Sequence, residues 1–344
     1  MLSLITATEA AITHQIAAPA AFLHGLPISL TTPQIPLEIA ARFAPASDLR
    51  AAHRLTKLVP SAAITHAHGL RAGWIAALAH HIRPFPFLLT AHNIAEGGTL
   101  TRLAVKTIAQ RAKAIIAVSQ AVADSLVTLG APPEKIIVIS NGVDTEHFAH
   151  LPTQADARRS LGLAPNTYTL GCIARLSPEK GVDTLIQAAA ALPDMRVIIA
   201  GDGPQRNTLQ AALPPNVSLL GRIPDTRALL SAVNALVIPS RMEGQGIVAL
   251  EAMAAHVPII ASRVGGLAEM LSENDTALLI PPANPDALVR AITRLRADPA
   301  LQEHLTHTAA RLVRTRYALP RTVAAIADVY AAVAASMPVR PPQP

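Results

Sequence analysis

The sequence predicts an α/β protein built from two successive doubly wound units with parallel sheets. The first observation behind this prediction is that short aliphatic runs alternate with alanine-rich helical patterns, as in βαβ units. The second is that this rhythm breaks at residues 145–167 and then starts again. The third is length, because 344 residues are enough for two domains of ordinary size.

The first half of the chain contains four candidate strands, and helical patterns separate them. These strands are AAIT (62–65), FLLTAH (87–92), AIIAVS (114–119) and KIIVIS (135–140). Helices are expected between them, for example over 69–82 and 119–130.

The second half repeats the pattern with six candidate strands. They are YTLGCIARL (168–176), MRVIIAG (195–201), VSLLG (217–221), ALVIPS (235–240), VPIIAS (257–262) and ALLIPP (277–282). A helical pattern fills each gap, and one more helix is expected over 320–336 after a proline start.

Composition limits the possible partners. A net charge of +6 favours anionic ligands such as phosphates, nucleotides or acidic lipids, although an arginine-rich composition explains this charge equally well. Aromatic residues make up only 3% of the chain, which argues against a single-stranded nucleic-acid binder. The single cysteine, Cys172, excludes an internal disulfide, and we found neither a signal-peptide pattern nor an apolar run of ~18 residues. We therefore expect a cytoplasmic protein.

In open α/β sheets, ligands bind outside the carboxyl ends of the strands. Arg175 and Lys180 follow such a strand end and could give two positive charges to a diphosphate; in isolation, a solvated charged loop explains them better. The GDGP turn (201–204) follows the next strand end. It is a weak signal, because it lacks the full glycine pattern and the acidic residue of a dinucleotide site.

The stretch RMEGQGIVALEAMA (241–254) combines a glycine-rich turn, a helix start and two carboxylates, Glu243 and Glu251. The helix N-terminus favours a phosphate. From inside the helix, Glu251 could accept hydrogen bonds from a ribose, while Glu243 would face a hydroxylated group beyond the phosphates. The alternative is that Glu243 interacts only with the helix dipole and that Glu251 is a surface residue.

Taken together in chain order, these motifs resemble those of family 4 glycosyltransferases. The motifs are Arg175…Lys180, GDGP, EGQGIVALE and ASRVGGLAEM, preceded by THAHG, LLTAHN, IAVSQAVADSL and VISNGVDTEHF. The spacing of Glu243 and Glu251 is the Glu-x7-Glu signature of that family. The resemblance covers about residues 62–335 and implies the GT-B fold, in which two Rossmann-like domains face a cleft.

The resemblance also implies roles for the residues of the second half. Arg175 and Lys180 would bind the donor diphosphate and stabilise it as the leaving group. Glu243 would hold hydroxyls of the donor sugar, and Glu251 would hold the ribose. The remaining donor-binding positions implied in this half, mostly through backbone groups, are Gly203, Ile223 in the turn 221–224, Gln245, Gly246 and Ile247.

In the first half, the resemblance implies that His92 faces the donor sugar and that His68 lies on the acceptor side. Close histidine pairs at His66-Ala-His68 and His80-His81 also permit a zinc hypothesis. A cleft histidine is the better interpretation, because no carboxylate cluster accompanies these pairs. There is no Asp-x-Asp motif, so we expect neither a metal nor another cofactor, and Arg175 and Lys180 would neutralise the diphosphate.

The expected organisation is an acceptor-side domain over 1–147, a nucleotide-sugar-binding domain over 148–318, a helix over 319–336 that packs back on the first domain, and a disordered tail over 337–344. Two departures from the family pattern stand out. The opening strand and its glycine-rich loop are not recognisable, which suggests a truncated first domain. Gln245 stands where an aromatic residue is common.

The expected function is metal-independent, retaining transfer of a sugar from a UDP- or GDP-type donor to a glycan, lipid-linked or small-molecule acceptor, in cell-envelope or exopolysaccharide synthesis. The alternatives are a truncated nucleotide-sugar binder without activity and a GT-B epimerase. The segment 99–113 carries four Lys or Arg residues and no acid, which suggests peripheral contact with an anionic membrane; a solvated helix face is equally consistent. No nucleic-acid partner is expected.

Overall fold

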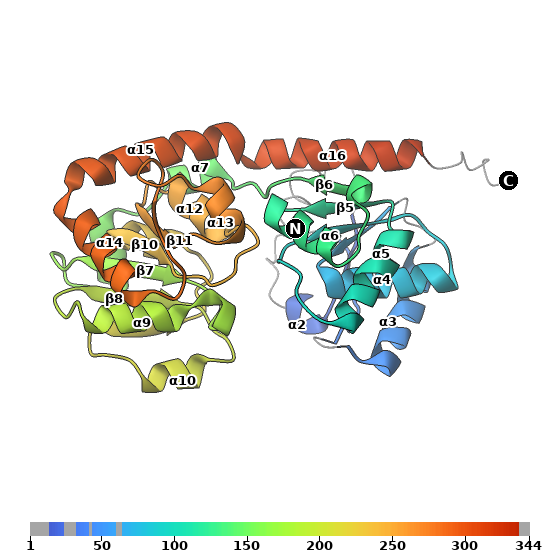
Figure 1. Cartoon of the computed structure of the whole chain (residues 1–344), viewed down its shortest axis with the longest axis horizontal. Coiled ribbons are helices and arrows are strands. Elements are labelled where there is room, and N and C mark those ends of the chain that lie inside the picture. Colours follow the sequence, from blue (N-terminus) through green and yellow to red (C-terminus); the bar gives the residue numbers. More distant parts are fainter. Residues whose placement is uncertain (1–13, 24–31, 41–42, 60–63, 337–344) are drawn as a thin grey trace. The chain divides into compact units, whose positions relative to one another are not determined.

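The computed structural model describes residues 14–23, 32–40, 43–59 and 64–336. The chain divides into two compact units (Figure 1). Unit 1 comprises Met1–Ser140 together with Leu319–Pro344, and unit 2 comprises Asn141–Ala318. Each unit is an α/β body with its own parallel sheet and core.

Unit 2 has a six-stranded sheet in the order β12-β11-β10-β7-β8-β9, and every pair is parallel. Counted from β7, this is the 3-2-1-4-5-6 order of a Rossmann unit, which confirms the predicted fold class. The six predicted strands of this half all occur. They are β7 (Thr169–Ile173), β8 (Arg196–Ala200), β9 (Val217–Gly221), β10 (Ala235–Ile238), β11 (Ile259–Ser262) and β12 (Leu278–Ile280).

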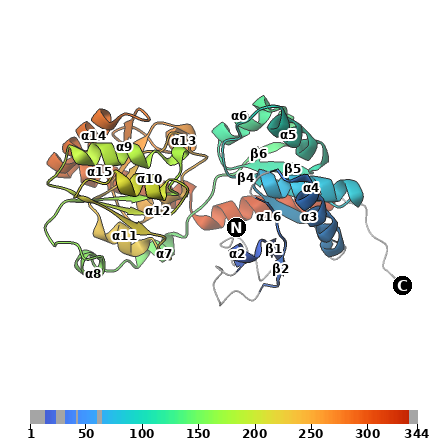
Figure 2. The same ribbon diagram turned by 90° about the horizontal axis from the view of Figure 1, so that it is seen from below.

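Helices cover both faces of this sheet, and Figure 2 shows α9 and α11 on opposite sides of it. Alternate residues of one strand enter opposite core layers: Ile198 packs with α11 and α12, whereas Val197 and Ile199 pack with α9 and α14. The helical elements of unit 2 are α7 (Thr145–Ala149), α8 (Gln154–Ser160), the 3₁₀ turn Pro178–Lys180, α9 (Val182–Ala190), α10 (Arg206–Ala211), α11 (Arg227–Ala232), α12 (Ile247–Ala254), α13 (Gly265–Met270), α14 (Pro285–Ala297) and α15 (Pro299–Arg316).

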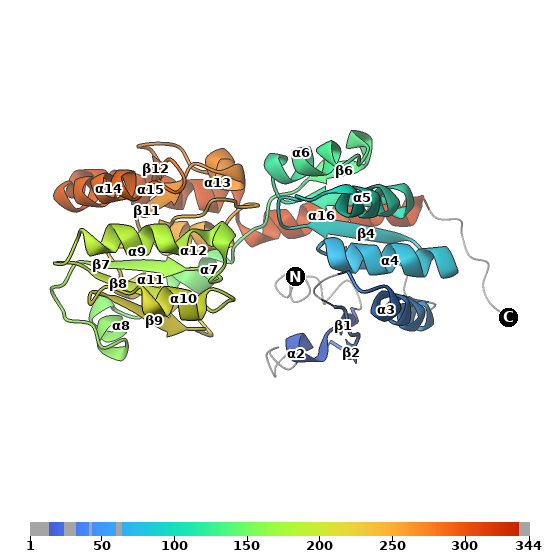
Figure 3. The ribbon, with the colours of Figure 1, turned by 60° about the horizontal axis from the view of Figure 1, so that its bottom comes forward.

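Unit 1 has a parallel sheet in the order β3-β4-β5-β6 and a separate parallel pair, β1-β2. Figure 3 shows α3 lying beside α4 in this unit. Its elements are β1 (Ile16–Ala18), α2 (Ala20–Leu23), β2 (Gln34–Pro36), α3 (Pro45–Leu58), β3 (Thr65–His68), α4 (Leu70–Ile82), β4 (Phe87–Ala91), α5 (Thr99–Arg111), β5 (Ala114–Ala117), α6 (Gln120–Thr128), the 3₁₀ turn Pro133–Lys135, β6 (Ile136–Val138) and, from the far end of the chain, α16 (Leu319–Ala335).

The C-terminal helix α16 belongs to unit 1. Its residues Ile326, Val329 and Val333 form a buried cluster with Leu88 of β4 and Ile116 of β5. The strands of this sheet are therefore buried on one face by helices that are near in sequence and on the other by a helix from the end of the chain.

Two sequence expectations differ from the structure. The first strand of the unit 1 sheet is Thr65–His68 and does not end at residue 65, because the alternating stretch THAH pairs residue by residue with Phe87–Thr90. Residues 62 and 63 of the predicted strand lie outside the described residues. The division between the units falls at Ser140/Asn141, seven residues before the predicted position at 147/148. Here Val143 and Phe148 are buried in the core of unit 2.

Other expectations concern residues that the structure does not describe. The predicted tail over 337–344 lies outside the described residues, as do residues 1–13 at the beginning of the chain. Among the described helices, none combines the length and the apolar character that crossing a bilayer requires.

Candidate active site

The topology of unit 2 marks one edge of its sheet as the binding edge. Strands β7 and β10 are neighbours, but the chain leaves them for opposite sides of the sheet, so a crevice forms outside their carboxyl ends. The loop after β7 carries Arg175 and Lys180, and the loop after β10 carries Glu243. The sheet order therefore brings together three of the predicted site residues, which are far apart in the sequence.

Lys180 and Glu243 form an ion pair across these two loops. The Lys180 Nζ lies 2.7 Å from the Glu243 Oε2, and the Ser240 hydroxyl donates a hydrogen bond to the same oxygen at 3.1 Å. Both side chains are largely buried, at 23% and 11% relative exposure. Arg175 extends from the same loop as Lys180, is exposed, and has no ion-pair partner in the described part of the chain.

The two loops are fixed to one another by backbone contacts. The Arg241 N–H donates to the Glu179 carbonyl at 2.8 Å, and the Arg241 guanidinium pairs with Asp183 at the start of α9. Gly181 has φ +59°, and a Cβ there would lie 2.1 Å from the Pro239 carbonyl oxygen. Only glycine fits, so the Lys180 loop is pressed against the end of β10.

The EGQG turn ahead of α12 is held from two sides. On one side, the Gly266 N–H at the start of α13 donates to the Glu243 carbonyl at 3.1 Å. The Gln245 side chain is only 3% exposed, and its Oε1 accepts hydrogen bonds from the Asn141 backbone N–H at 2.7 Å and from the Asn141 Nδ2 at 2.8 Å. Asn141 is the first residue of unit 2. The turn is therefore tied to the point at which the chain enters its unit.

Helix α12 starts directly after this turn, at Ile247, whose side chain is 50% exposed. Gly246 precedes it with φ +85°, and the first amides of the helix are available for an anion. Glu251 follows on the same helix. Burial raises the pKa of its carboxyl above the usual value, a hydrogen bond with Thr226 opposes this, and the nearby Asp225 raises the pKa further.

Gly203 and Ile223, two of the predicted donor-binding residues, pack against other parts of unit 2. A Cβ at Gly203 would lie 2.4 Å from the Leu176 carbonyl oxygen, so this glycine packs against the loop of Arg175 and Lys180. Its N–H donates to the Asp202 carboxylate at 2.8 Å. Ile223 lies in the turn after β9, partly buried against the core of unit 2.

In unit 1, three histidines gather where β3 and β4 end. His68 Nδ1 lies 3.0 Å from His92 Nε2, and the rings of His66 and His68 stack with centroids 4.4 Å apart. His66 contacts the Thr90 hydroxyl at 2.7 Å and the Tyr330 hydroxyl at 2.6 Å. Burial lowers the pKa values of these histidines, to about 3 for His66, about 2 for His68 and about 4 for His92. All three rings are therefore neutral near pH 7.

No sequence motif pointed to a role for Tyr330, Thr90 or Asn141, and His66 entered only the zinc hypothesis. Tyr330 lies 264 residues from its partner His66, so no local pattern could connect them. His80 also belonged to the zinc hypothesis. Its Nδ1 lies 2.8 Å from the Phe85 carbonyl oxygen, a contact within its own segment. In the described part of the chain, no group of three or more His, Cys, Asp or Glu side chains is arranged to hold a metal ion.

A doubly wound unit with a cation–carboxylate pair at its switch point, accompanied by a second parallel-sheet unit, has the architecture of a GT-B glycosyltransferase. Comparisons with known proteins agree. The family model "Glycosyl transferases group 1" matches residues 153–312, and the family model "Glycosyltransferase Family 4" matches residues 12–147. The chain belongs to glycosyltransferase family 4, as its motifs predicted.

Individual relatives support this assignment. A D-inositol 3-phosphate glycosyltransferase of Streptomyces bingchenggensis is 33% identical over 301 residues, which cover 78% of this chain and 66% of the relative, slightly less than two thirds of its length. The protein of the same name from Actinosynnema mirum is 30% identical over 281 residues, or 72% of this chain and 67% of the relative.

Solved structures show the same fold. A glycosyltransferase from Rickettsia africae superposes with a TM-score of 0.83 at 18% identity, covering 98% of this chain and 94% of that one. HepE of Anabaena, solved with UDP and glucose, gives a TM-score of 0.81 at 24% identity, covering 87% and 86%. At these identities the likeness concerns the fold alone.

Proposed function

We propose that this chain transfers a hexosyl group from a nucleoside diphosphate sugar to a hydroxyl acceptor. The observation that carries the proposal is the pairing of Lys180 with Glu243 at the switch point of a Rossmann unit, directly before the N-terminus of α12. Cations and helix amides at that position stabilise negative charge, and the adjacent carboxylate accepts hydrogen bonds from sugar hydroxyls.

In the proposed reaction, the bond between the sugar C1 and the diphosphate oxygen breaks, and its electron pair leaves with the diphosphate. A new bond forms between C1 and the acceptor oxygen, and the proton of the acceptor hydroxyl passes to the departing diphosphate. Negative charge develops on the diphosphate, where Lys180 and the exposed Arg175 stabilise it more in the transition state than in the ground state. We propose, from the family resemblance, that the reaction is retaining and independent of a metal.

The donor would lie along the loops of unit 2. We propose that Glu251, next to Thr226, holds the ribose, and that Glu243 holds the sugar. The amides of Gln245, Gly246 and Ile247 would meet the phosphates. Structures of the similar HepE contain UDP and UDP-glucose, so uridine nucleotides are the first donors to test. In unit 1, His92 would contact the donor sugar, and His68 would lie on the acceptor side.

A panel of UDP- and GDP-sugars tests the proposal, with thermal shift for binding and product analysis for turnover. At 100 times its Kd, a ligand adds about 2.7 kcal/mol to the free energy of unfolding. We expect one donor class to stabilise the protein and to release nucleoside diphosphate, and Lys180→Ala to slow that release by about 100-fold or more. Stabilisation without turnover would favour the non-catalytic binder, and an epimerised sugar would favour the epimerase. No stabilisation by any nucleotide sugar would contradict all three.

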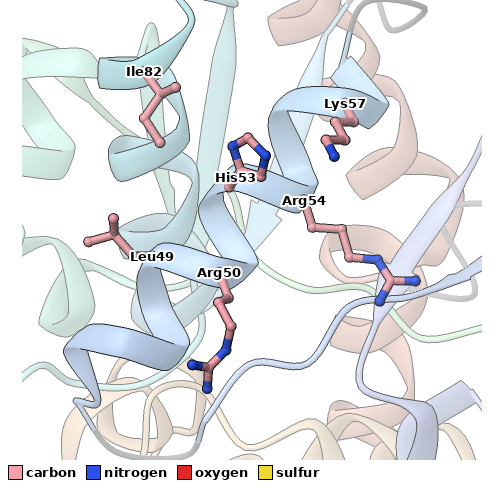
Figure 4. Close-up of a pocket in the computed structure, with 6 residues that line it drawn as sticks. All are labelled: Leu49, Arg50, His53, Arg54, Lys57 and Ile82. Atoms are coloured by element: carbon pink, nitrogen blue, oxygen red, sulfur yellow. The ribbon is translucent and has the colours of Figure 1, made fainter.

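We propose that the protein acts at the cytoplasmic surface of an anionic membrane, because unit 1 carries a cationic face on α3. Leu49 and Ile82 are 59% and 50% exposed beside it, which suits contact with lipid. An open pocket of about 640 Å³ lies at this face. Figure 4 shows the residues that line it, which are Leu49, Arg50, His53, Arg54, Lys57 and Ile82. No acidic side chain lines it among the described residues.

Helix α5, within the predicted basic segment 99–113, is a weaker candidate for the membrane contact. It too combines exposed cationic and apolar side chains. Arg102 and Lys106 are exposed there next to Leu100 and Leu103. Flotation with vesicles containing phosphatidylglycerol distinguishes the two helices. We expect binding that declines with salt and is lost in Arg50→Gln/Arg54→Gln/Lys57→Gln, while Arg102→Gln/Lys106→Gln retains most of it. Equal flotation with neutral vesicles would contradict an electrostatic contact.

A further inference from the structure

The histidine cluster of unit 1 includes a residue from the far end of the chain. Tyr330 lies on α16, and its hydroxyl oxygen is 2.6 Å from His66 Nδ1, with the two rings edge to face at 89°. Helix α16 is fixed in place by the buried cluster around Ile326, Val329 and Val333, and by the Thr322 hydroxyl, which donates to the Ser140 carbonyl at 2.9 Å. The position of Tyr330 is therefore rigidly set.

Tyr330 and Thr90 together fix the ring of His66. They contact its two nitrogens from opposite edges, at 2.6 Å and 2.7 Å. Burial raises the pKa of Tyr330 to about 12, so its hydroxyl keeps its proton at neutral pH. A neutral imidazole has one donor and one acceptor nitrogen, and hydroxyl groups can satisfy either. His66 can therefore bind no further ligand through its nitrogens and serves as a platform.

The platform orients His68, and His68 orients His92. The rings of His66 and His68 stack at 26° with centroids 4.4 Å apart, and those of His68 and His92 lie within 14° of parallel. The 3.0 Å contact between His68 Nδ1 and His92 Nε2 needs one N–H and one lone pair. Whichever ring donates, the two remaining nitrogens, His68 Nε2 and His92 Nδ1, comprise one donor and one acceptor.

We propose that Tyr330 and His66 are positioning residues that hold the His68–His92 pair so that it presents one hydrogen-bond donor and one acceptor to substrate hydroxyls. This inference rests on the proposed function, in which His92 serves the donor sugar and His68 the acceptor. A hydroxyl group both donates and accepts, so a complementary nitrogen pair matches it better than an imidazolium, which only donates. The C-terminal helix thus takes part in the site through a single hydroxyl group.

Tyr330→Phe removes only that hydroxyl. With a turned-over nucleotide sugar, we expect kcat to fall about ten-fold, the size of one lost hydrogen bond, and the donor KM to change little. Thr90→Val removes the other contact of His66 and should act in the same way. Tyr168→Phe is the matched control, because the buried Tyr168 hydroxyl has no hydrogen-bond partner in the described part of the chain.

A double variant separates positioning from general destabilisation. In a His66→Phe background, Tyr330→Phe should have no further effect on kcat, because its influence passes through His66. Additive losses, or a Tyr330→Phe enzyme as active as Tyr168→Phe, would overturn the inference.

A second readout is independent of activity. Imidazole ¹⁵N chemical shifts report the tautomers of His68 and His92 and the hydrogen bond between them, which depends on the orientation of the stacked rings. We expect Tyr330→Phe to change these shifts while Tyr168→Phe does not. Unchanged shifts would refute the positioning role. If the wild-type chain turns over no nucleotide sugar, the proposed function fails, and these shifts still decide whether Tyr330 sets the histidine pair.

Discussion

The Lys180 ammonium group lies 2.7 Å from the Glu243 carboxylate, although 63 residues separate them in the sequence. The pair exists because β7 and β10 are neighbours in the sheet, so their following loops meet at one edge. In the proposed reaction, the two residues contact different parts of one donor. Their mutual contact also keeps each charge compensated in a site that is largely buried.

Removing the Lys180 ammonium group tests its role at the diphosphate. We expect Lys180→Ala to lower kcat by about 100-fold or more, as for the loss of one group that stabilises transition-state charge. Thermal unfolding should show a protein that folds but is less stable, because Glu243 keeps the Ser240 hydrogen bond and loses its charge partner. Lys113→Ala, at an exposed position of unit 1, is the control. A folded Lys180→Ala enzyme with normal turnover would refute the assignment.

Glu251 should show a conflict between stability and binding. Because burial raises its pKa, the folded state disfavours the charged form, and the carboxylate costs stability above that pKa. Glu251→Gln should therefore raise the unfolding temperature at pH 7, an advantage that shrinks as pH falls and the carboxyl protonates. The same variant should weaken nucleoside diphosphate binding about ten-fold, measured by calorimetry. Unchanged affinity would show that Glu251 does not hold the ribose.

Gln245 should stabilise unit 2 through Asn141. Gln245→Met keeps the length of the side chain but leaves the Asn141 N–H without its acceptor, so we expect a loss of about 1–3 kcal/mol in the free energy of unfolding. Denaturant unfolding measures this loss. Gln187→Met, at an exposed position of α9 in the same unit, should be nearly neutral. Equal stability of the two variants would mean that the contact contributes little.

Acid should destabilise unit 1 through its histidines. The folded pKa values of His66, His68 and His92 lie at about 3, 2 and 4, whereas the unfolded value is 6.5. The unfolded chain therefore binds more protons below pH 6.5, and stability is lost as the pH falls from 6.5 towards 4.

Each proton taken up on unfolding lowers the free energy of unfolding by about 1.4 kcal/mol per pH unit. The only tryptophan, Trp74, lies in α4, so its fluorescence reports on this unit. His66→Phe should make the dependence shallower. Unfolding that is independent of pH between 7 and 5 would contradict neutral, buried rings.

The fold was largely predictable from the sequence because its signals are local. Strand-length aliphatic runs and alanine-rich helical patterns gave all six strands of unit 2. The start of β3 was misplaced because AAIT is as apolar as a strand, while the true strand THAH contains two histidines. The unit boundary was misplaced because Val143 and Phe148 lie in a polar stretch that does not look like core.

The candidate site was also predictable only in part, for the same reason. The sequence determined the residue types at the strand ends of unit 2, because glycine turns, a helix start and two spaced glutamates are local signals. Only the tertiary structure decided that Lys180 pairs with Glu243, that Gln245 binds Asn141, and that Tyr330 reaches His66. Each of these contacts joins segments 63 to 264 residues apart, and sheet order and helix docking create such contacts without leaving a pattern in the sequence.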